Sequence, residues 1–216
     1  MDPTRIIAIR HGETAWNADT RIQGHLDIPL NDTGLWQAQR LARVLADEPI
    51  HAIYSSDLAR AYQTASAITA AHPELAGRAP QKMEILRERC FGMFEGKTWA
   101  EIDTHWPELA TRWRRREPDF APEGGETLLQ LRERVQQAVN TLAAPHGGQQ
   151  IVLVAHGGVM DALYRLATGQ GLAEPRTWAL GNTAINRLLW TPDGMTLIGW
   201  SDTRHLEDGA LDEASA

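Results

Sequence analysis

The sequence RIIAIRHGE, residues 5–13, joins a short apolar run to a charged turn, and this stretch decides the fold class. Residues 5–9 are rich in β-branched side chains and end at a glycine-containing turn, which predicts a buried strand. A second run, IVLVA at residues 151–155, is almost wholly apolar, as expected of a strand whose two faces are both covered by helices. His11 and His156 therefore each lie just beyond the carboxyl end of a predicted strand.

Segments with helical periodicity alternate with these strands. Apolar residues recur at helical spacing over residues 33–47, 58–71 and 126–143, and residues 98–116 form one or two helices interrupted at Pro107. Ser56 or Asp57 is the expected N-cap of the helix at residues 58–71. The remaining predicted strands are residues 51–55, residues 82–86, and a hairpin of residues 183–190 and 195–201. This order predicts an α/β fold, a three-layer α/β/α sandwich with a mixed, mostly parallel sheet and helices on both faces.

Length and composition indicate one ordinary globular domain over residues 1–216. The chain is 43% apolar and 23% charged, which favours neither disorder nor a membrane span. The acidic, alanine-rich tail, about residues 207–216, is expected to be frayed.

Three features of the sequence limit the cellular locations and the binding partners that we expect for the protein. Only four consecutive apolar residues, 6–9, occur near the N-terminus, too few for the core of a signal peptide. Cys90 is the single cysteine and cannot form an internal disulfide, so we interpret it as a packing residue and expect a cytoplasmic location. The net charge of −7 argues against non-specific binding to nucleic acid or to an anionic membrane.

Charged residues follow several predicted strands. Arg10 and His11 follow the first strand, Arg60 opens the helix after the second, Glu88 follows the third, and His156 follows the long apolar strand. Ligands of open α/β sheets bind beyond the carboxyl ends of the strands. Guanidinium groups match phosphate oxygens, and the glycine after each histidine lets backbone amides approach an anion. The sequence therefore predicts a cationic phosphate pocket at this rim.

Histidine is able to attack phosphorus when its imidazole is neutral. The charges of Arg10 and Arg60 oppose protonation of His11 and favour its neutral form, which makes His11 the predicted nucleophile. A carboxyl group can then protonate the leaving oxygen and later accept a proton from water. Glu88 is the favoured carboxyl group, and this chemistry requires no metal.

Two other carboxyl groups, Glu84 and Glu95, are alternative proton donors. Glu84 falls inside the predicted strand at residues 82–86, so Glu88 is preferred. None of the remaining histidines has zinc-site spacing with its neighbours, and we interpret them as surface or packing residues. Three tryptophans at sevenfold spacing indicate a helix face in a core or cap. They are Trp99, Trp106 and Trp113.

Short motifs follow one another along almost the whole chain. They are RHGETAWN at residues 10–17, RIQG at 21–24, LNDTG at 30–34, SSDLARA at 55–61, LRE at 86–88, FG at 91–92, EG at 95–96, EGGET at 123–127 and VAHGG at 154–158. This ordered series resembles the histidine phosphatase, or phosphoglycerate-mutase-like, superfamily, whose signature is RHGE.

The resemblance implies a role for each matching residue. His11 becomes phosphorylated, Glu88 matches the proton donor, and the phosphoryl group is bound by Arg10, Arg60 and His156. The positions that line the phosphate site in relatives match Asn17, Gln23, Gly24 and Gly157. The expected activity is hydrolysis of a small phosphorylated metabolite through a phospho-histidine, without metal or cofactor.

Within that superfamily, three features resemble phosphatases more than mutases. The chain lacks the longer insertion that mutases carry ahead of the Gly-Gly-Glu segment. Gln23-Gly24 has the phosphatase-like pattern, and Gly157-Gly158-Val159 replaces the Gly-Asn-Ser that mutases usually carry after the distal histidine.

Other interpretations remain open. Arg114, Arg115 and Arg116 resemble the paired arginines with which mutases hold a carboxylate, although such a run is more often a solvated helix face. Cofactor-dependent phosphoglycerate mutase is therefore the first alternative. A non-catalytic module that binds phospho-ligands is the second, although all five predicted catalytic residues are retained. An exposed hairpin edge makes a homodimer a further prediction.

Overall fold

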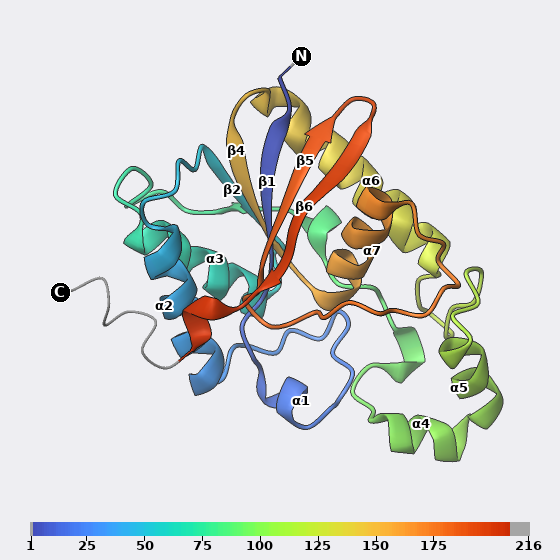
Figure 1. Ribbon diagram of the computed structural model, residues 1–216. Helices are drawn as coiled ribbons and strands as arrows, with labels where there is room; N and C mark the ends of the chain where they lie inside the picture. Colours follow the sequence, from blue (N-terminus) through green and yellow to red (C-terminus); the bar gives the residue numbers. More distant parts are fainter. Residues whose placement is uncertain (1, 208–216) are drawn as a thin grey trace.

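Strand β1 (Thr4–Arg10) runs through the middle of the sheet, between β4 (Gln150–Ala155) and β5 (Ile185–Thr191). It is parallel to β4 and antiparallel to β5. The computed structural model describes residues 2–207, and the full strand order is β3-β2-β4-β1-β5-β6 (Figure 1). The remaining strands are β2 (Ala52–Ser55), β3 (Gln81–Lys82) and β6 (Gly194–Asp202). The first four strands in this order are parallel, so the predicted mixed, mostly parallel sheet is confirmed.

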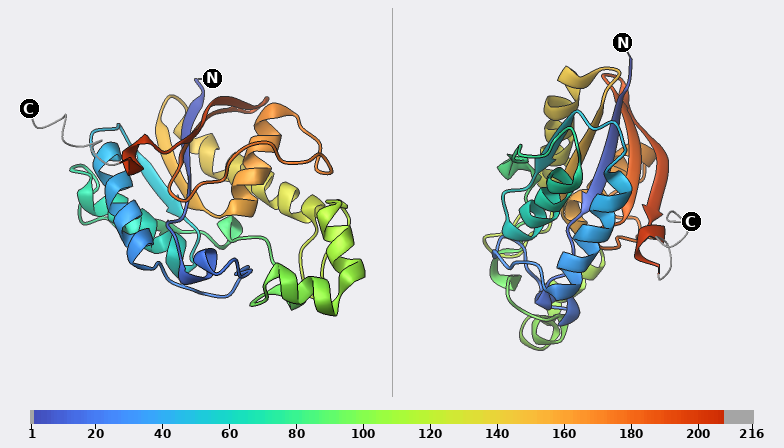
Figure 2. Two further views of the ribbon diagram at one scale, coloured as in Figure 1. Left: turned by 60° about the horizontal axis from the view of Figure 1, so that its bottom comes forward. Right: turned by 90° about the vertical axis from the view of Figure 1, so that its left-hand side faces the viewer.

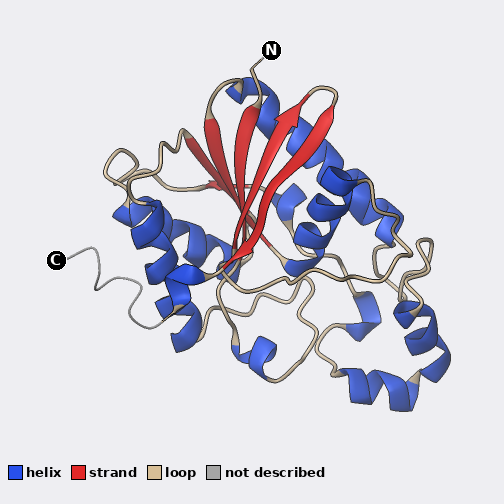
Figure 3. Cartoon of the chain, in the orientation of Figure 1, coloured by secondary structure: helices blue, strands red, loops and turns tan. Residues whose placement is uncertain are grey.

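Helices cover both faces of this sheet, as Figure 3 shows. Ile7 and Ile9 of β1 pack in a cluster with apolar residues of α2 and α3, whereas Ile6 and Ala8 pack with those of α6 and α7. The alternation of side chains along β1 thus builds two cores, one on each face. The helices are α1 (Ala15–Ala18), α2 (Asp32–Leu45), α3 (Ala59–Ala71), α4 (Trp99–His105), α5 (Pro107–Arg114), α6 (Leu128–Ala143) and α7 (Gly157–Thr168). Short 3-10 helices are η1 (Glu84–Leu86), η2 (Gly92–Phe94), η3 (Ala144–His146) and η4 (Arg204–Leu206). The three-layer α/β/α prediction is confirmed.

The N-cap predicted for α3 is wrong. Leu58 occupies that position and makes no side-chain capping bond. The N–H of Ala59, at the start of α3, instead donates to Asp27 Oδ1 at 2.7 Å. A partner 32 residues away satisfies the donor that a local cap would otherwise take.

The strand predicted at residues 82–86 is also wrong over most of its length. Pairing with β2 ends at Lys82, and residues 84–86 form η1, in which the N–H of Leu86 donates to the carbonyl of Met83. β3 is an edge strand, with β2 as its one neighbour among the described residues, so little pairing holds the chain extended. Glu88 is consequently presented by the loop after η1 and not by the end of a strand.

Helices α4 and α5 form a cap, which we define as residues 98–116. Figure 2 shows this pair standing apart from the helices that cover the sheet. The two helices are separated at Pro107, as predicted, because a proline begins α5. The three tryptophans pack with Ile102 and Ala110 in an apolar cluster of the cap, which confirms their interpretation as a cap core.

The C-terminal hairpin is confirmed as β5 and β6, although both strands begin and end slightly differently from the prediction. Most of the predicted frayed tail, residues 208–216, lies outside the described residues. Among the helices of residues 2–207, none has the length and apolar character to cross a membrane.

Candidate active site

The carboxyl ends of the central strands border a cleft of about 970 Å³, whose opposite wall is formed by the cap. Eight of the nine predicted site residues line this cleft, and the ninth, His156, lies directly behind His11. The eight are Arg10, His11, Asn17, Gln23, Gly24, Arg60, Glu88 and Gly157. The structure thus brings together residues that are spread over almost 150 positions of the sequence.

His11 lies at the bottom of the cleft and is 2% exposed. Its Nδ1 donates to the carbonyl of Gly12 at 2.7 Å, which leaves Nε2 with a free electron pair. Burial, followed by the charges of Arg60 and Arg10, holds the pKa of His11 well below its usual value of 6.5. The imidazole is therefore neutral at pH 7 and has a free nitrogen with which to attack an electrophile.

The backbone of this turn is fixed from two sides. The N–H of Gly12 donates to Thr64 Oγ1 of α3 at 3.0 Å, and Asn182 Nδ2 donates to the carbonyl of His11 at 2.7 Å. These two contacts come from the helix after β2 and the loop before β5. Together with the bond from His11 Nδ1 to the carbonyl of Gly12, they place the imidazole.

Arg60 is buried and Arg10 is half-buried beside His11, and each is anchored by backbone carbonyls. Arg60 donates to Gly24 O at 2.7 Å and to Leu26 O at 2.9 Å, while Arg10 Nη1 donates to the carbonyl of Leu180. The Nε atom of each guanidinium is buried and has no hydrogen-bond partner within residues 2–207. Both side chains are held rigidly but keep a donor free.

His156 is fully buried and packs against His11, with 5.2 Å between the ring centroids. Neither of its ring nitrogens has a partner in the described chain. Burial, and after it the charge of Arg60, holds its pKa well below the usual value. His156 is also the N-cap residue of α7, so the positive end of that helix dipole points toward the same region.

Buried polar atoms are nearly always hydrogen-bonded, and an unpaired one costs about 1–3 kcal/mol. Unpaired donors at Arg10, Arg60 and His156 converge here beside a helix N-terminus. An anion with several oxygens would satisfy all of them at once, and the planar guanidinium groups match phosphate geometry. The arrangement is therefore suited to a phosphoryl group next to His11.

The Glu88 carboxylate faces this position from the loop after η1. It accepts hydrogen bonds from the N–H of Arg89 at 2.7 Å and of Gly158 at 3.0 Å. A Cβ at Gly158 would lie 2.4 Å from Glu88 Oε1, so a larger residue here would displace the Glu88 carboxylate. A Cβ at Gly157 would lie 3.6 Å from Arg10 Nε and 3.7 Å from Glu88 Oε2, which shows how close these two side chains are.

The alternative proton donors lie elsewhere. Glu84 is exposed beside Arg87, with 3.7 Å between the charged groups, and Glu95 accepts the backbone N–H groups of His25 and Phe91 at 3.0 Å each. Neither carboxyl group lines the cleft. The sequence argument placed Glu84 inside a strand, whereas Glu84 begins η1, but the geometry still favours Glu88.

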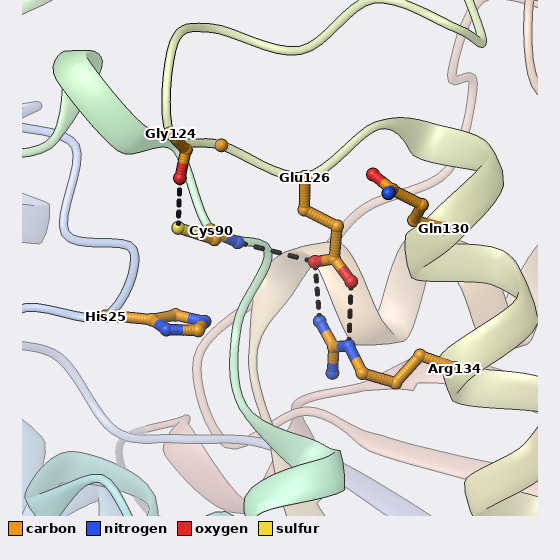
Figure 4. A pocket seen from close by; sticks show the side chains of 7 residues that line it. His25, Cys90, Gly124, Glu126, Gln130 and Arg134 are labelled. Carbon is orange, nitrogen blue, oxygen red and sulfur yellow. Dashed lines mark hydrogen bonds and ion pairs between the residues drawn. The ribbon is translucent and has the colours of Figure 1, made fainter.

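A clamp formed by Arg134 and Glu126 holds the Glu88 loop from behind, as Figure 4 shows for the two side chains. Arg134 pairs with both oxygens of Glu126 at 2.7 and 2.8 Å and donates to the carbonyls of Ile85 and Arg87 at 2.9 Å. It also reaches the carbonyl of Glu88 at 3.3 Å. Sequence reasoning missed this clamp, although Glu126 lies in the EGGET motif.

Glu126 and Arg134 also line a small pocket, and His25 and Cys90 are two further residues of its lining (Figure 4). His25 was interpreted as a surface or packing residue, and its Nε2 donates to the carbonyl of Glu88 at 2.8 Å, so it also supports the loop. The half-buried Cys90 thiol contacts the carbonyl of Gly124, and burial raises its pKa. Cys90 therefore packs as predicted.

Three of the predicted substrate-binding residues, Asn17, Gln23 and Gly24, line another part of the cleft. Asn17 Oδ1 caps α1 through the N–H of Thr14, which leaves its amide group for a ligand. Gln23 is buried, and its Oε1 has no partner within the described residues. Gly24 has a φ of +52°, and a Cβ there would lie 2.1 Å from Glu95 Oε1, so this tight turn also requires glycine.

The cleft is strongly basic although the chain is acidic. Seven arginines line it, against two carboxylates, Glu88 and Asp161. Arg114 and Arg116 are among them. Arg114 is nevertheless 55% exposed and pairs with Asp103, so the solvated-face interpretation holds for it but is wrong for the half-buried Arg116. Arg115 is exposed and lies outside the cleft. Sequence reasoning missed three other arginines, because periodicity does not reveal which way a loop or cap faces. They are Arg21, Arg89 and Arg176.

Arg89 illustrates how the cap is joined to the site. Its guanidinium lies 4.2 Å from the Trp113 ring and donates to the carbonyls of Glu126 and Phe120 at 2.7 and 3.0 Å. Burial lowers its pKa to about 10, so it stays charged at pH 7. Within residues 2–207, no three His, Cys, Asp or Glu side chains form a group that would hold a metal ion.

The sequence pattern of the histidine phosphatase superfamily, branch 1, matches residues 6–203 of this chain. The chain belongs to the histidine phosphatase superfamily. This confirms the family resemblance drawn from the ordered motifs. The matched residues include every part of the cleft described above.

Curated members of this superfamily resemble the chain over nearly its full length. Phosphoglycerate mutase-like protein 4 of Arabidopsis thaliana is 38% identical over 211 residues, covering 96% of this chain and 89% of that protein. The metal-independent phosphoserine phosphatase of the same plant is 36% identical over 208 residues, covering 94% and 83%. A solved mycobacterial glucosyl-3-phosphoglycerate phosphatase, in complex with VO3, has a TM-score of 0.81 at 33% identity and covers 92% of this chain and 99% of that one.

Proposed function

We propose that the protein hydrolyses phosphomonoesters of small metabolites through a phospho-histidine at His11, with Glu88 as proton donor and acceptor. The observation that carries this proposal is a neutral, buried His11 surrounded by unpaired donors of Arg10, Arg60 and His156. Two similar proteins are phosphatases by name, and one solved phosphatase holds VO3. These likenesses support the assignment.

In the first half-reaction, His11 Nε2 attacks phosphorus as the bond to the leaving oxygen breaks. Arg10, Arg60 and His156 donate to the phosphoryl oxygens and stabilise the charge that they carry in the transition state. Glu88 gives its proton to the leaving oxygen, and the alcohol departs.

In the second half-reaction, water attacks the phosphorus of phospho-His11. Glu88, now ionised, takes a proton from that water while the nitrogen–phosphorus bond breaks. The products are inorganic phosphate and a neutral His11. Arginines, a histidine and a helix N-terminus supply the positive charge in both steps.

The test is to trap the intermediate. The wild-type protein, mixed with a ³²P-labelled ester and quenched within milliseconds, should carry label that is stable to base and lost in acid, as a phosphoramidate is. His11→Ala should show neither label nor turnover while remaining folded. His105→Ala, an exposed histidine on α4, is the matched control. Label on the His11→Ala protein would show that another residue is the nucleophile.

The mutase alternative is favoured by one observation, because Arg114 and Arg116 line the cleft instead of facing solvent alone. A mutase passes the phosphoryl group to a second hydroxyl and must exclude water. We expect hydrolysis to dominate. The assay supplies 3-phosphoglycerate with catalytic 2,3-bisphosphoglycerate and follows 2-phosphoglycerate and free phosphate together. Rapid interconversion with little phosphate release would establish the mutase instead.

A single domain over residues 1–216, a cytoplasmic location and a homodimer stay predictions from the sequence. The reaction proposed here requires none of the three.

A further inference from the structure

Asp161 lies on α7 and is one of the two carboxylates that line the cleft. Its side chain is 10% exposed, and one of its oxygens, Oδ2, accepts hydrogen bonds from Arg116 at 2.8 Å and from Arg165 at 3.0 Å. The other oxygen, Oδ1, is buried and has no hydrogen-bond partner within residues 2–207. An unsatisfied buried acceptor costs about 1–3 kcal/mol, so a ligand that donates to Oδ1 would remove this cost.

The place of Asp161 on α7 relates it to the leaving group. Asp161 comes three residues after Gly158, whose N–H donates to Glu88 at the start of the helix. Residues three apart lie on the same side of an α-helix, and three residues advance it by about 4.5 Å. In the proposed reaction, Glu88 faces the oxygen that leaves. Asp161 therefore lies about one turn farther along α7, where the rest of the leaving alcohol extends into the cleft.

The Asp161 carboxylate is fixed by anchored partners. Arg165, which bonds to Oδ2, also donates to the carbonyl of Glu174 at 2.9 Å. Arg116, the second partner of Oδ2, also donates to the carbonyl of Leu172 at 3.0 Å. A carboxylate held by two anchored guanidinium groups does not turn freely to seek another donor. Its second oxygen is therefore positioned in advance for a ligand.

The charges around Asp161 select the kind of donor. Its one negative charge faces the two guanidinium groups of Arg116 and Arg165, so the cluster is positive. Arg176 lines the same cleft and adds a further positive charge. These arginines repel an ammonium group, whereas a neutral hydroxyl donates a hydrogen bond without adding charge. The donor that suits Oδ1 is therefore a hydroxyl.

We infer that Asp161 is a specificity-determining residue, whose Oδ1 accepts a hydrogen bond from a hydroxyl group of the leaving alcohol. The favoured substrate is thus the phosphomonoester of a polyol, with a free hydroxyl a few bonds from the ester oxygen. This inference rests on the proposed phosphatase function. Asp161 takes no part in the transfer itself, which stays with His11, Glu88 and the donors around the phosphoryl group.

The first test compares esters on the wild-type protein. Glycerol 3-phosphate carries two free hydroxyls, and 2,3-difluoropropyl phosphate has fluorine in their place, with similar size and electron withdrawal but no O–H donor. Phosphate release gives kcat/KM for each ester. We expect a preference for glycerol 3-phosphate of about tenfold or more, because a buried acceptor rejects an analogue that leaves it unpaired. In 3-aminopropyl phosphate an ammonium replaces the hydroxyl, and this ester should be hydrolysed less well than glycerol 3-phosphate.

The second test changes the acceptor. Asp161→Asn keeps the size of the side chain but replaces a carboxylate by a weaker acceptor, so the ratio of the first two esters should fall at least threefold. Hydrolysis of nitrophenyl phosphate, whose leaving group has no second hydroxyl, should change less. Arg116→Met removes the ion pair to the cap but keeps Oδ1, and it should retain the wild-type ratio. Asp119→Asn makes the same exchange at an exposed position outside the cleft and should also retain it.

An unchanged ratio in Asp161→Asn would overturn the inference. Equal falls in Asp161→Asn and Arg116→Met would do the same, because they would trace the preference to the ion pair. If Asp161→Asn does not fold, the wild-type comparison decides, since equal rates for the hydroxyl and fluorine esters, or a preference for the ammonium ester, contradict the inference. Each of these results leaves the phosphatase proposal intact while nitrophenyl phosphate is hydrolysed. No phosphate release from any ester would overturn both.

Discussion

Glu88 is held by backbone alone, because its carboxylate accepts from two N–H groups and from no side-chain donor within residues 2–207. One of these N–H groups belongs to Gly158 at the start of α7, where a larger residue would displace the Glu88 carboxylate. A carboxylate fixed in this way stays free to exchange a proton with a leaving group. Gly158, the second glycine after His156, therefore helps to position Glu88 directly, through its backbone N–H.

Glu88→Gln should lower kcat by about 100-fold or more for alkyl phosphates, whose leaving oxygen needs a proton, and by much less for nitrophenyl phosphate, whose anion leaves unprotonated. The amide fills the same space, so folding should not change. Steady-state phosphate release from the two esters measures the contrast. Similar losses on both would argue that Glu88 only positions the phosphoryl group.

The two cleft histidines make stability depend on pH. In the unfolded chain they take up protons below about pH 6.5, whereas burial and the charge of Arg60 keep His11 and His156 neutral in the folded protein. The unfolded state then binds more protons, so the free energy of unfolding falls as the pH drops from about 6.5 toward the lowered pKa values. Each histidine contributes up to about 1.4 kcal/mol per pH unit in that window.

His156→Gln should therefore make this dependence shallower by up to about 1.4 kcal/mol per pH unit between pH 6.5 and 5. Urea unfolding at several pH values measures it, and carboxylates that titrate in both proteins cancel in the difference. His105→Gln, exposed on α4, should leave the slope as it is. Identical slopes in the wild-type and His156→Gln proteins would mean that His156 is protonated in the folded state.

At the scale of elements, a clamp between α6 and the preceding loop controls where Glu88 lies. Arg134 holds three carbonyls of residues 85–88, and Glu126 accepts a further bond from the N–H of Cys90 at 3.4 Å. The loop has no sheet pairing of its own, since β3 ends at Lys82. Its position therefore depends on the side chain of Arg134, which does not itself line the cleft.

Arg134→Met should slow alkyl phosphate hydrolysis about tenfold, with a smaller loss for nitrophenyl phosphate, because a displaced Glu88 protonates the leaving oxygen poorly. The same leaving-group contrast as in Glu88→Gln, at reduced size, identifies a positioning role. Arg132→Met, two residues earlier and exposed, is the matched control. Equal losses on both esters, together with a lower melting temperature, would indicate a purely structural role.

The elements differ in how far their sequence predicts them. Strands β1 and β4 are buried on both faces, so their apolar runs identify them, and the histidines that follow are placed with them. The short β3 is ended by its place at the edge of the sheet, which no local pattern records. Arg134 and Arg176 escaped prediction for a related reason, because tertiary contacts decide which loop each one faces.

For the molecule as a whole, charge is separated between the surface and the cleft. The chain has a net charge of −7, yet the cleft is lined by seven arginines and two carboxylates. An acidic exterior repels anionic polymers, while a basic, partly enclosed cleft attracts small anions. The composition alone predicted only the exterior, and the motif series predicted the part of the cleft around His11.

The order of strands in the sheet also bears on how the protein is made. β1 is complete after ten residues, but its two neighbours, β4 and β5, end at residues 155 and 191. Ribosomes add about 5–20 residues per second, so β1 waits several seconds or longer before β4, the first of its two partners, has been made. The bonds from Asn182 and Thr183 that fix the backbone at His11 and Arg10 form last. A nascent chain therefore completes its anion pocket only after residue 183 has been made, and a fragment that ends before β4 lacks a central strand of the sheet as well as the bonds that fix the reactive turn.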